Sequence, residues 1–245
     1  NPSSVISKIE EYQVNVLPTR PTFLNIMMME ESFSSIKLQS LKLITYGTER
    51  MSEGLLKKLN SNLPKIKLLQ TFGTSETGIL KTRSKSSSSL FFKIIDEEKD
   101  YKIVNEELYL RSKTQVNGYV NHKNDNFLAE GWYASGDLVE IDGDGYLKII
   151  GRKNKVINVG GLKVLPKEIE DVINSVNGVD DSTVFSEPNN LVGNIVCAKI
   201  FTQLENIKEL KSEIKSVCRE NLDKYKLPVK LFFEKLEMTN RGKKI

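Results

Sequence analysis

The sequence predicts an α/β fold followed by an α+β fold, and three observations carry this prediction. In the first third of the chain, apolar runs alternate with helical stretches, which indicates strand–helix–strand units and a parallel sheet. Between residues 90 and 150 short strands separated by turn residues indicate a small antiparallel or barrel-like subdomain. After Gly151 helices and strands mix in a compact unit of about 90 residues. We therefore expect one domain over 1–151 and a second over 152–245.

Each element of the first third has its own signal. The run YQVNVL at 12–17 is rich in strand formers, and the prolines after it break the strand. A helix is expected over 23–31, and buried strands ending in glycine are expected over 41–47 and 65–73. Ser52 is placed to cap the helix between those two strands. Because ligands bind beyond the carboxyl ends of parallel strands, the two glycine-bearing loops there are the expected place of a site.

The middle of the chain begins with KTRSKSSSS at 81–89, whose Ser/Lys bias predicts a mobile surface loop. The short strands that follow are expected over 90–95, 101–104, 106–112, 139–142 and 146–150. DGDG, which starts at Asp142, lies between the last two of these strands. An EF-hand loop needs a Glu at its twelfth position, where this sequence has Lys153, so DGDG is interpreted as a hairpin turn.

The last part has clear helix boundaries. A helix is expected over 165–178, with Pro166 in its first turn and Gly178 as its C-terminal cap. Its apolar residues recur at i, i+3, i+4 and i+7, which builds one apolar face. The remaining expected elements are strands over 182–187, 194–203 and 229–236 and a helix over 207–221.

Composition excludes several classes of protein. The net charge of +4 is spread among interspersed acidic and basic residues, so no basic stripe favours nucleic-acid binding. No apolar run reaches the roughly 18 residues of a membrane span. Cys197 and Cys218 do not make a zinc site and mark no oxidising compartment, so a cytoplasmic protein is expected. His122, the single histidine, stands in a polar turn. The N-terminus lacks the pattern of a signal peptide and, without Met, suggests a fragment.

Several polar residues form a candidate site. Ser75 and Glu76 follow a strand end, and a hydroxyl beside a carboxylate can bind a phosphate oxygen and Mg²⁺. Asp137, in the tight glycine turn SGDL, can accept both ribose hydroxyls, and Arg152 can add a cation near the same sugar. Lys243 stands on a glycine-preceded tail. Taken singly, each has an ordinary structural interpretation, since Asp after Gly is common in turns and terminal lysines are usually solvated.

Together and in order, these stretches resemble the adenylate-forming superfamily, which includes acyl- and aryl-CoA synthetases and peptide-synthetase adenylation domains. The stretches that carry the resemblance are VLPTRPTFL, TYGTER, FGTSE, GWYASGDL, GRKNKVINVGGLKVLPKEIE and TNRGKK. The resemblance spans nearly the whole chain. The family's Gly/Ser/Thr-rich phosphate loop has no match in residues 1–245, so the chain resembles the later half of a synthetase. The resemblance therefore implies that the chain holds the remainder of a large N-terminal domain followed by a small mobile C-terminal domain.

The resemblance also implies a function and a role for each motif. The family activates a carboxylic acid with ATP and Mg²⁺ as an acyl-adenylate and transfers it to the thiol of CoA or of phosphopantetheine, the latter on an acyl carrier protein. Glu76 would hold Mg²⁺, Lys243 would act in adenylation, and Asn154 would stand at the hinge. The residues implied to contact ATP or the thiol are Gly47, Thr48, Glu49, Thr71, Phe72, Gly73, Thr74, Ser75, Asp137, Arg152, Gly160 and Gly161.

Some positions depart from the family's pattern. Phe72 replaces the common tyrosine, Ser75 and Ser135 replace threonine, and Asn154 stands where Asp or Lys is usual. Pro21, Thr22 and Phe23 border either the acyl pocket or only a loop core. Two alternatives to the acid–thiol ligase stay open: an amino-acid-activating adenylation domain that serves a carrier protein, and an inert or binding fragment. The acid, the acceptor thiol and the oligomeric state are not determined by the sequence.

Overall fold

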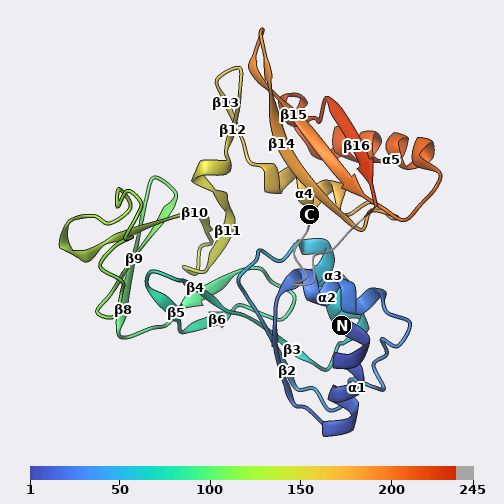
Figure 1. Cartoon of the computed structure of the whole chain (residues 1–245), viewed down its shortest axis with the longest axis horizontal. Coiled ribbons are helices and arrows are strands. Elements are labelled where there is room, and N and C mark those ends of the chain that lie inside the picture. Colours follow the sequence, from blue (N-terminus) through green and yellow to red (C-terminus); the bar gives the residue numbers. More distant parts are fainter. Residues whose placement is uncertain (236–245) are drawn as a thin grey trace. The chain divides into compact units, whose positions relative to one another are not determined.

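A computed structural model describes residues 1–235 of the chain (Figure 1). The chain divides into two compact units, Asn1–Ile149 and Ile150–Ile245. None of the described helices is long and apolar enough to cross a membrane.

The first unit opens with a three-stranded parallel sheet in the order β1-β2-β3. Its strands are β1 (Val16–Thr19), β2 (Leu43–Tyr46) and β3 (Lys67–Gln70), and its helices are α1 (Pro2–Tyr12), α2 (Pro21–Met29) and α3 (Glu53–Asn62). Thr19 pairs with Tyr46, and Tyr46 pairs with Gln70, so the three carboxyl ends are in register. The parallel pairing predicted from the strand–helix–strand pattern is therefore confirmed.

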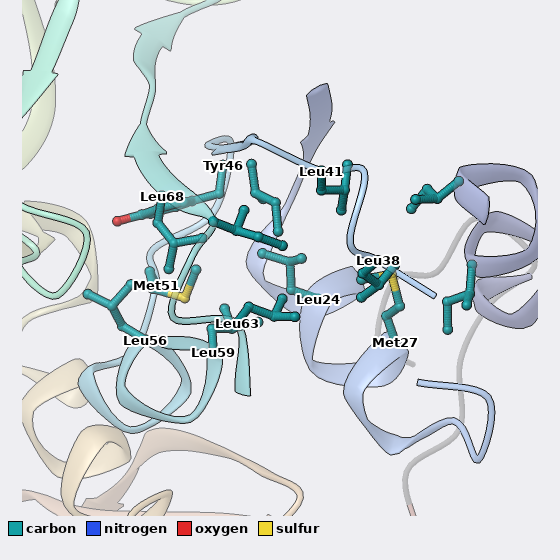
Figure 2. Close-up of a cluster of buried hydrophobic side chains, with 14 of the residues drawn as sticks. Leu24, Met27, Leu38, Leu41, Tyr46, Met51, Leu56, Leu59, Leu63 and Leu68 are labelled. Carbon is teal, nitrogen blue, oxygen red and sulfur yellow. The ribbon is translucent and has the colours of Figure 1, made fainter. Parts of the chain in front are cut away.

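The core of this sheet is formed by leucines and methionines of the helices. Figure 2 shows Leu24 of α2 and Leu56 and Leu59 of α3 gathered with Tyr46 and Leu68 of the sheet, all buried. The predicted cap of α3 is also confirmed, because the Ser52 hydroxyl accepts a 3.2 Å hydrogen bond from Leu55 N. These contacts hold α3 against the core of the parallel sheet.

One expected strand is shifted. The strand predicted over 12–17 starts only at Val16, because α1 continues to Tyr12 and Gln13 then takes a left-handed conformation that ends it. Pro18 lies inside β1 instead of breaking it. A proline is tolerated there because β1 is an edge strand of its sheet, where no neighbour needs its missing N–H.

The middle of the chain forms a six-stranded sheet in the order β6-β7-β11-β10-β9-β8. The strands are β6 (Thr82–Ser84), β7 (Phe92–Ile94), β8 (Lys99–Val104), β9 (Glu107–Ser112), β10 (Tyr133–Ile141) and β11 (Leu147–Arg152). A hairpin of β4 (Phe72–Thr74) and β5 (Gly78–Leu80) precedes it. The pairs β6–β7, β7–β11, β10–β9 and β9–β8 run antiparallel, as the sequence predicts.

The Ser/Lys-rich segment 81–89 is not the mobile loop expected from its composition. Thr82–Ser84 is a strand paired with β7, and Lys85 N donates to Phe91 O at 2.8 Å. The Lys85 ammonium contacts Asp142 at 2.7 Å and Asp144 at 2.9 Å. The prediction from composition was wrong because the polar side chains of this segment form ion pairs and hydrogen bonds with other parts of the same unit.

The DGDG turn is confirmed. Asp142 Oδ1 accepts hydrogen bonds from the backbone N–H groups of Asp144 and Tyr146, at 3.0 and 2.8 Å. Asp142 N also donates to Tyr146 O at 3.0 Å, which closes the connection between β10 and β11. The aspartates thus serve the turn and the ion pairs with Lys85.

The second unit has a three-stranded sheet, β14 (Asp181–Asn189), β15 (Gly193–Phe201) and β16 (Lys230–Glu234). β14 runs antiparallel to β15, and β16 runs parallel to it. The helices α4 (Pro166–Ile173) and α5 (Ile207–Asn221) contribute Ile169, Ile173, Leu210 and Ile214 to the core. A short hairpin, β12 (Ile157–Val159) and β13 (Leu162–Val164), precedes α4.

The helix expected over 165–178 is shorter than predicted. It ends at Ile173, and Gly178 is therefore not its cap. Two turn bonds, Ser175 N to Val172 O and Val176 N to Ile173 O, replace the last helical turns. Val176 remains buried in the core, so the apolar spacing that suggested a longer helix is satisfied by turns.

Candidate active site

The loops after β2 and β3 begin side by side at the carboxyl edge of the parallel sheet. Thr71 N donates to Tyr46 O at 2.8 Å, and the Thr71 hydroxyl donates to the same oxygen at 3.1 Å. A Cβ on Gly47 would lie 2.3 Å from Thr71 Oγ1 and 2.9 Å from Thr71 O. Only a residue without a side chain fits there, because the two loops pass in contact. The structure thus brings Gly47 and Thr71 together, as the sequence predicts for neighbouring strand ends.

Glu49 has a structural partner. Its Oε2 accepts from Thr22 N at 3.1 Å and from the Thr22 hydroxyl at 2.5 Å, and Arg20 lies 3.9 Å from Oε1. Thr22 stands in the first turn of α2, where an anionic acceptor is favoured by the unpaired N–H groups. Thr48, beside it, has a left-handed φ of 64°. The loop 47–50 is therefore fixed to the start of α2.

Pro21 and Phe23 belong to the same corner of the fold. Pro21 is buried at the start of α2, and Phe23 packs against the core of the parallel sheet. These contacts support the loop-core interpretation of the two residues.

The segment 72–77 after β3 is a tight hairpin. Phe72 is half-buried and packs on Phe92, with ring centroids 5.6 Å apart. The Thr74 hydroxyl accepts from Thr77 N at 3.1 Å and lies 3.0 Å from the Thr77 hydroxyl. Ser75 is exposed at the turn. The hairpin therefore presents Ser75 to solvent while it fixes its neighbours.

Glu76 is held by a segment 40 and more residues away. The Tyr119 hydroxyl donates to Glu76 Oε1 at 2.5 Å and lies 3.3 Å from the Tyr133 hydroxyl. Val116 N donates to Glu76 O at 2.9 Å. Phe127 packs edge-on to Tyr119 at 5.4 Å and also contacts Tyr133. The backbone and side chain of Glu76 are thus both restrained.

These contacts keep the Glu76 carboxyl ionised. Partial burial favours its neutral form, but hydrogen bonds from Tyr119, the Glu76 backbone and other side chains outweigh burial and lower its pKa. The pKa of Tyr119 is raised, chiefly because its proton is shared with Glu76. The pKa of Tyr133 is raised by burial and by the same two neighbours. The phenols are neutral donors beside a charged carboxylate.

One carboxylate of this kind suits the Mg²⁺ that the family resemblance implies. Proteins usually hold Mg²⁺ through one or two carboxylates together with substrate phosphates. Within the described residues, no cluster of three or more His, Cys, Asp or Glu side chains could form a cage by itself. A lone, ionised Glu76 next to the exposed Ser75 fits a metal that arrives with a nucleotide.

Asp137 lies in a bulged strand, not in the tight turn expected from SGDL. The pairing of β10 with β9 shifts between Ala134 and Leu138, and Gly136 within the bulge has a φ of 74°. Ser135 Oγ donates to Leu108 O at 2.7 Å and accepts from Asp137 N at 3.1 Å. Ser135 and Asp137, on either side of Gly136, are both buried in this bulged strand. Three residues lie between Tyr133 and Asp137, so β10 links the Glu76 network to the predicted ribose residue.

The sequence reasoning missed Tyr119 and Glu107. Glu107 Oε1 accepts from Gly136 N at 3.2 Å and so secures the bulge. Tyr119 lies in NGYV, a polar stretch between strands without any hydrophobic period. The only local signal is Gly118, whose φ of 145° and close approach to Asn124 exclude a side chain. Neither contact partner could be inferred from spacing.

Four predicted residues belong to the second unit. Arg152 ends β11, and Asn154 lies in the single 3-10 turn Lys153–Lys155. Gly160 and Gly161 form the two-residue turn of the β12–β13 hairpin, with φ of 57° and 87°. Asn158 Oδ1 accepts from Gly161 N at 2.9 Å, and Gly160 N donates to Val192 O. Lys243 lies outside the described residues.

Comparison with known proteins finds matches along most of the chain. The model of the AMP-binding enzyme family matches residues 1–120, and the AMP-binding enzyme C-terminal domain matches residues 168–243. A long-chain-fatty-acid–CoA ligase from Yersinia pestis is 27% identical over 98% of this chain and 45% of its own length. A 2-succinylbenzoate–CoA ligase from Listeria monocytogenes is 30% identical over 73% of this chain and 39% of its own length. The chain spans less than half the length of these relatives.

The fold is shared with solved structures. The anthranilate CoA ligase AuaEII, in complex with anthranoyl-AMP, aligns with a TM-score of 0.82 at 23% identity, over 99% of this chain and 50% of that protein. This likeness confirms the predicted fold class. The two family models together cover most of the chain in the expected order, so the chain belongs to the AMP-binding enzyme family.

Proposed function

We propose that the protein containing this chain is an AMP-forming acid–thiol ligase. One observation carries the proposal: Tyr119 holds an ionised Glu76 in the hairpin that follows β3 at the carboxyl edge of the parallel sheet. The exposed Ser75 precedes it, and the paired glycine loop lies at the same edge. Ligand sites of open α/β sheets occupy this edge. The named CoA ligases among the relatives agree with this chemistry.

In the first step, a carboxylate oxygen attacks the α-phosphorus of ATP, and the bond to the β-phosphate oxygen breaks. Pyrophosphate leaves with that electron pair, and an acyl-adenylate forms. Mg²⁺, held by Glu76 when bound, would neutralise phosphate charge, which is the chief obstacle when two anions meet. Ser75 would donate to a phosphate oxygen. Asp137 would accept the ribose hydroxyls.

The base of the nucleotide would lie against the two loops that meet at the sheet edge. We assign this contact to Gly47, Thr48, Glu49 and the Thr71–Thr74 stretch. Phe72 offers an aromatic face beside the packing contact with Phe92. The hydrogen bonds from Thr22 to Glu49 would keep the loop in place before ATP arrives.

We assign the second step to the residues after Gly151. Residues 1–151 would be the later part of the nucleotide-binding domain, and 152–245 would be the mobile C-terminal domain. Asn154 would stand at the hinge and Arg152 beside the nucleotide. After rotation, the Gly160–Gly161 turn would face the thiol, whose sulfur attacks the acyl carbon and releases AMP. The division of the chain at Ile149 and Ile150 supports this boundary.

The acceptor is CoA in the first instance, since the relatives above are named CoA ligases. A pantetheine thiol on an acyl carrier protein is the alternative acceptor, with an amino acid as the acid. A further alternative is a catalytically inert or binding fragment, because residues 1–245 carry no phosphate loop. A cytoplasmic location, where ATP and CoA are available, stays part of the proposal.

Acid-dependent exchange of pyrophosphate into ATP tests the proposal. The complete gene product is expected to exchange with at least one member of a broad panel of fatty, aryl and amino acids. The isolated 1–245 chain is expected to be inactive. Exchange by the isolated chain would overturn the inert-fragment alternative, and no exchange by the complete product with any acid would sink the ligase.

The role of Lys243 is tested by separating the half-reactions. Lys243→Ala in the complete gene product is expected to abolish adenylation, because the cation that meets both anions is lost. Thioester formation from supplied acyl-adenylate is expected to survive. Equal loss of both half-reactions would refute the assignment.

The ribose assignment is tested by calorimetry. Asp137→Ala is expected to weaken ATP binding, and Asp137→Asn, which preserves the volume of this buried side chain, is the companion variant. Both variants should bind ATP less tightly than wild type. Asp137→Asn should do so at the melting temperature of wild type. Unchanged ATP affinity in the two variants would count against a ribose contact.

A further inference from the structure

β3 is an edge strand whose free side carries backbone groups that need partners. It pairs with β2 on one side only, and the N–H groups of Leu68 and Gln70 face the other side. Unpaired backbone groups at a partly buried edge are costly. Their partners decide how firmly the end of β3 is held.

Three hydroxyls of the Ser/Thr-rich segment supply these partners. Gln70 N donates to Ser84 Oγ at 2.8 Å, and the Thr82 hydroxyl donates to Gln70 O at 2.7 Å. Leu68 N donates to Ser87 Oγ at 3.1 Å. Both backbone polar groups of Gln70 are therefore bonded by side chains, in place of a neighbouring strand.

The residues that bear these hydroxyls stand on a firm base. Ser84 pairs with Phe92 and Thr82 with Ile94 in the β6–β7 ladder. Lys85, next to Ser84, is fixed by its ion pairs to the DGDG turn. The hydroxyls of Thr82 and Ser84 are thus presented by strand residues, so their bonds to Gln70 restrain its position at little further entropic cost.

The rung formed by Ser84 and Phe92 reaches the candidate site twice. Ser84 binds Gln70, the last residue of β3, and the Phe92 ring packs on Phe72 two residues later. Thr71 and Phe72 open the stretch that we assign to the nucleotide. A displacement of Gln70 would therefore move both the Thr71 contact with β2 and the Phe72 ring.

We propose that Thr82 and Ser84 are positioning residues for the nucleotide loop 71–76, acting through the Gln70 peptide groups. This inference rests on the proposed function for the ligand of the loop. The two hydrogen bonds from Thr82 and Ser84 to the Gln70 peptide groups, here called the hydroxyl clamp, do not depend on that function. Neither residue touches the nucleotide. Their hydroxyls fix the position of Gln70, and the stretch that carries Phe72 and Glu76 continues from Gln70.

The test compares isosteric and conservative variants of the complete gene product. Thr82→Val with Ser84→Ala removes both hydroxyls and preserves shape, whereas Thr82→Ser retains the donor. We expect the Gln70 amide to exchange hydrogen about three- to tenfold faster in the double variant, as for the loss of one or two ordinary hydrogen bonds. The KM for ATP should rise by a similar factor, with kcat little changed, and Thr82→Ser should behave as wild type.

Ser88→Ala is the matched control, because Ser88 is an exposed serine of the same segment whose hydroxyl contacts only Ser86 among the described residues. It should change neither measurement. If the double variant does not fold, Ser84→Ala alone tests exchange at the Gln70 amide, because Ser84 Oγ accepts from that N–H, and Thr82→Val against Thr82→Ser tests the KM for ATP. Unchanged exchange at Gln70, or equal damage by Thr82→Ser and Thr82→Val, overturns the clamp. Faster exchange at Gln70 in a protein without pyrophosphate exchange supports the clamp and overturns only the ligase.

Discussion

The Tyr119 hydroxyl donates a 2.5 Å hydrogen bond to Glu76 Oε1, across 43 residues of sequence. Val116 N holds the carbonyl of the same glutamate, so one short segment restrains Glu76 at both its backbone and its carboxylate. A carboxylate that is oriented before the ligand arrives loses less entropy when it binds. Tyr119 therefore prepares the residue that we assign to the metal.

Replacing Tyr119 by phenylalanine should loosen Glu76 and weaken the binding of ATP with Mg²⁺. The ring that packs on Phe127 is retained, and only the hydroxyl is lost. A hydrogen bond to a charged group contributes about 1.5–3 kcal/mol, of which we expect part to appear as an affinity loss of about tenfold. Isothermal calorimetry with and without Mg²⁺ measures this loss.

Tyr109→Phe is the control for this change. Tyr109 lies on β9, and the Lys102 ammonium lies over its ring at 5.9 Å, a contact that phenylalanine can also make. Affinity for ATP should be unchanged in this variant. A similar loss in both variants, or a loss in Tyr119→Phe that is independent of Mg²⁺, would contradict the role of Tyr119.

Gly47→Ala should disturb the site through contact with Thr71. The new methyl group would lie 2.9 Å from Thr71 O, so the backbone after β3 has to move. Overpacking of this kind costs about 1–3 kcal/mol of unfolding free energy. We expect lower stability in urea together with weaker ATP binding. Gly143→Ala is the control, because a Cβ there meets nothing within 4 Å; equal effects of the two substitutions would contradict the close approach.

Local patterns predicted those parts of the fold that depend on local physics. The strands that end at Tyr46 and Gln70 and the Ser52 cap follow from apolar runs and capping chemistry. The contacts that complete the site join distant segments, as Tyr119 and Glu76 do, and no periodicity encodes them. The loop predicted around Ser84 was wrong for the same reason. The composition of segment 81–89 is typical of a loop, but the Ser84 hydroxyl accepts a hydrogen bond from the edge strand β3.

The start of α3 should be sensitive to pH below 4.5. Glu53 bonds Lys148 at 2.8 Å, and this hydrogen bond is the largest cause that lowers the Glu53 pKa from its ordinary value of 4.5. Because the folded pKa is depressed, the contribution to stability is complete above 4.5 and is lost as pH falls through the folded pKa. The ion pair of Glu53 with Lys148 joins α3 to β11, the strand that leads to the proposed hinge.

Glu53→Gln tests this dependence. Urea unfolding of wild type and variant should differ near neutral pH, and the difference should shrink as pH falls below 4.5. The control is Glu97→Gln, which alters an exposed carboxyl on the same unit. A difference that persists unchanged at low pH would show that the ion pair does not carry the effect.

A substitution in the Gly160–Gly161 turn should affect one half-reaction and leave the other unchanged. Both residues have positive φ, as in a type I′ hairpin turn, and a Cβ on either meets nothing within 4 Å. Asn-Gly is the favoured sequence for this turn. Gly160→Asn is therefore expected to keep the hairpin and the hydrogen bond from Gly161 N to Asn158.

What Gly160→Asn changes is the face that we assign to the thiol. A side chain now projects where the pantetheine would pass, so thioester formation from supplied acyl-adenylate should slow, while pyrophosphate exchange and melting temperature stay at wild-type values. Gly145→Asn makes the same substitution at another positive-φ glycine, in the DGDG turn of the other unit, and should affect neither half-reaction. If Gly160→Asn slows both half-reactions equally, the turn does not serve the second step.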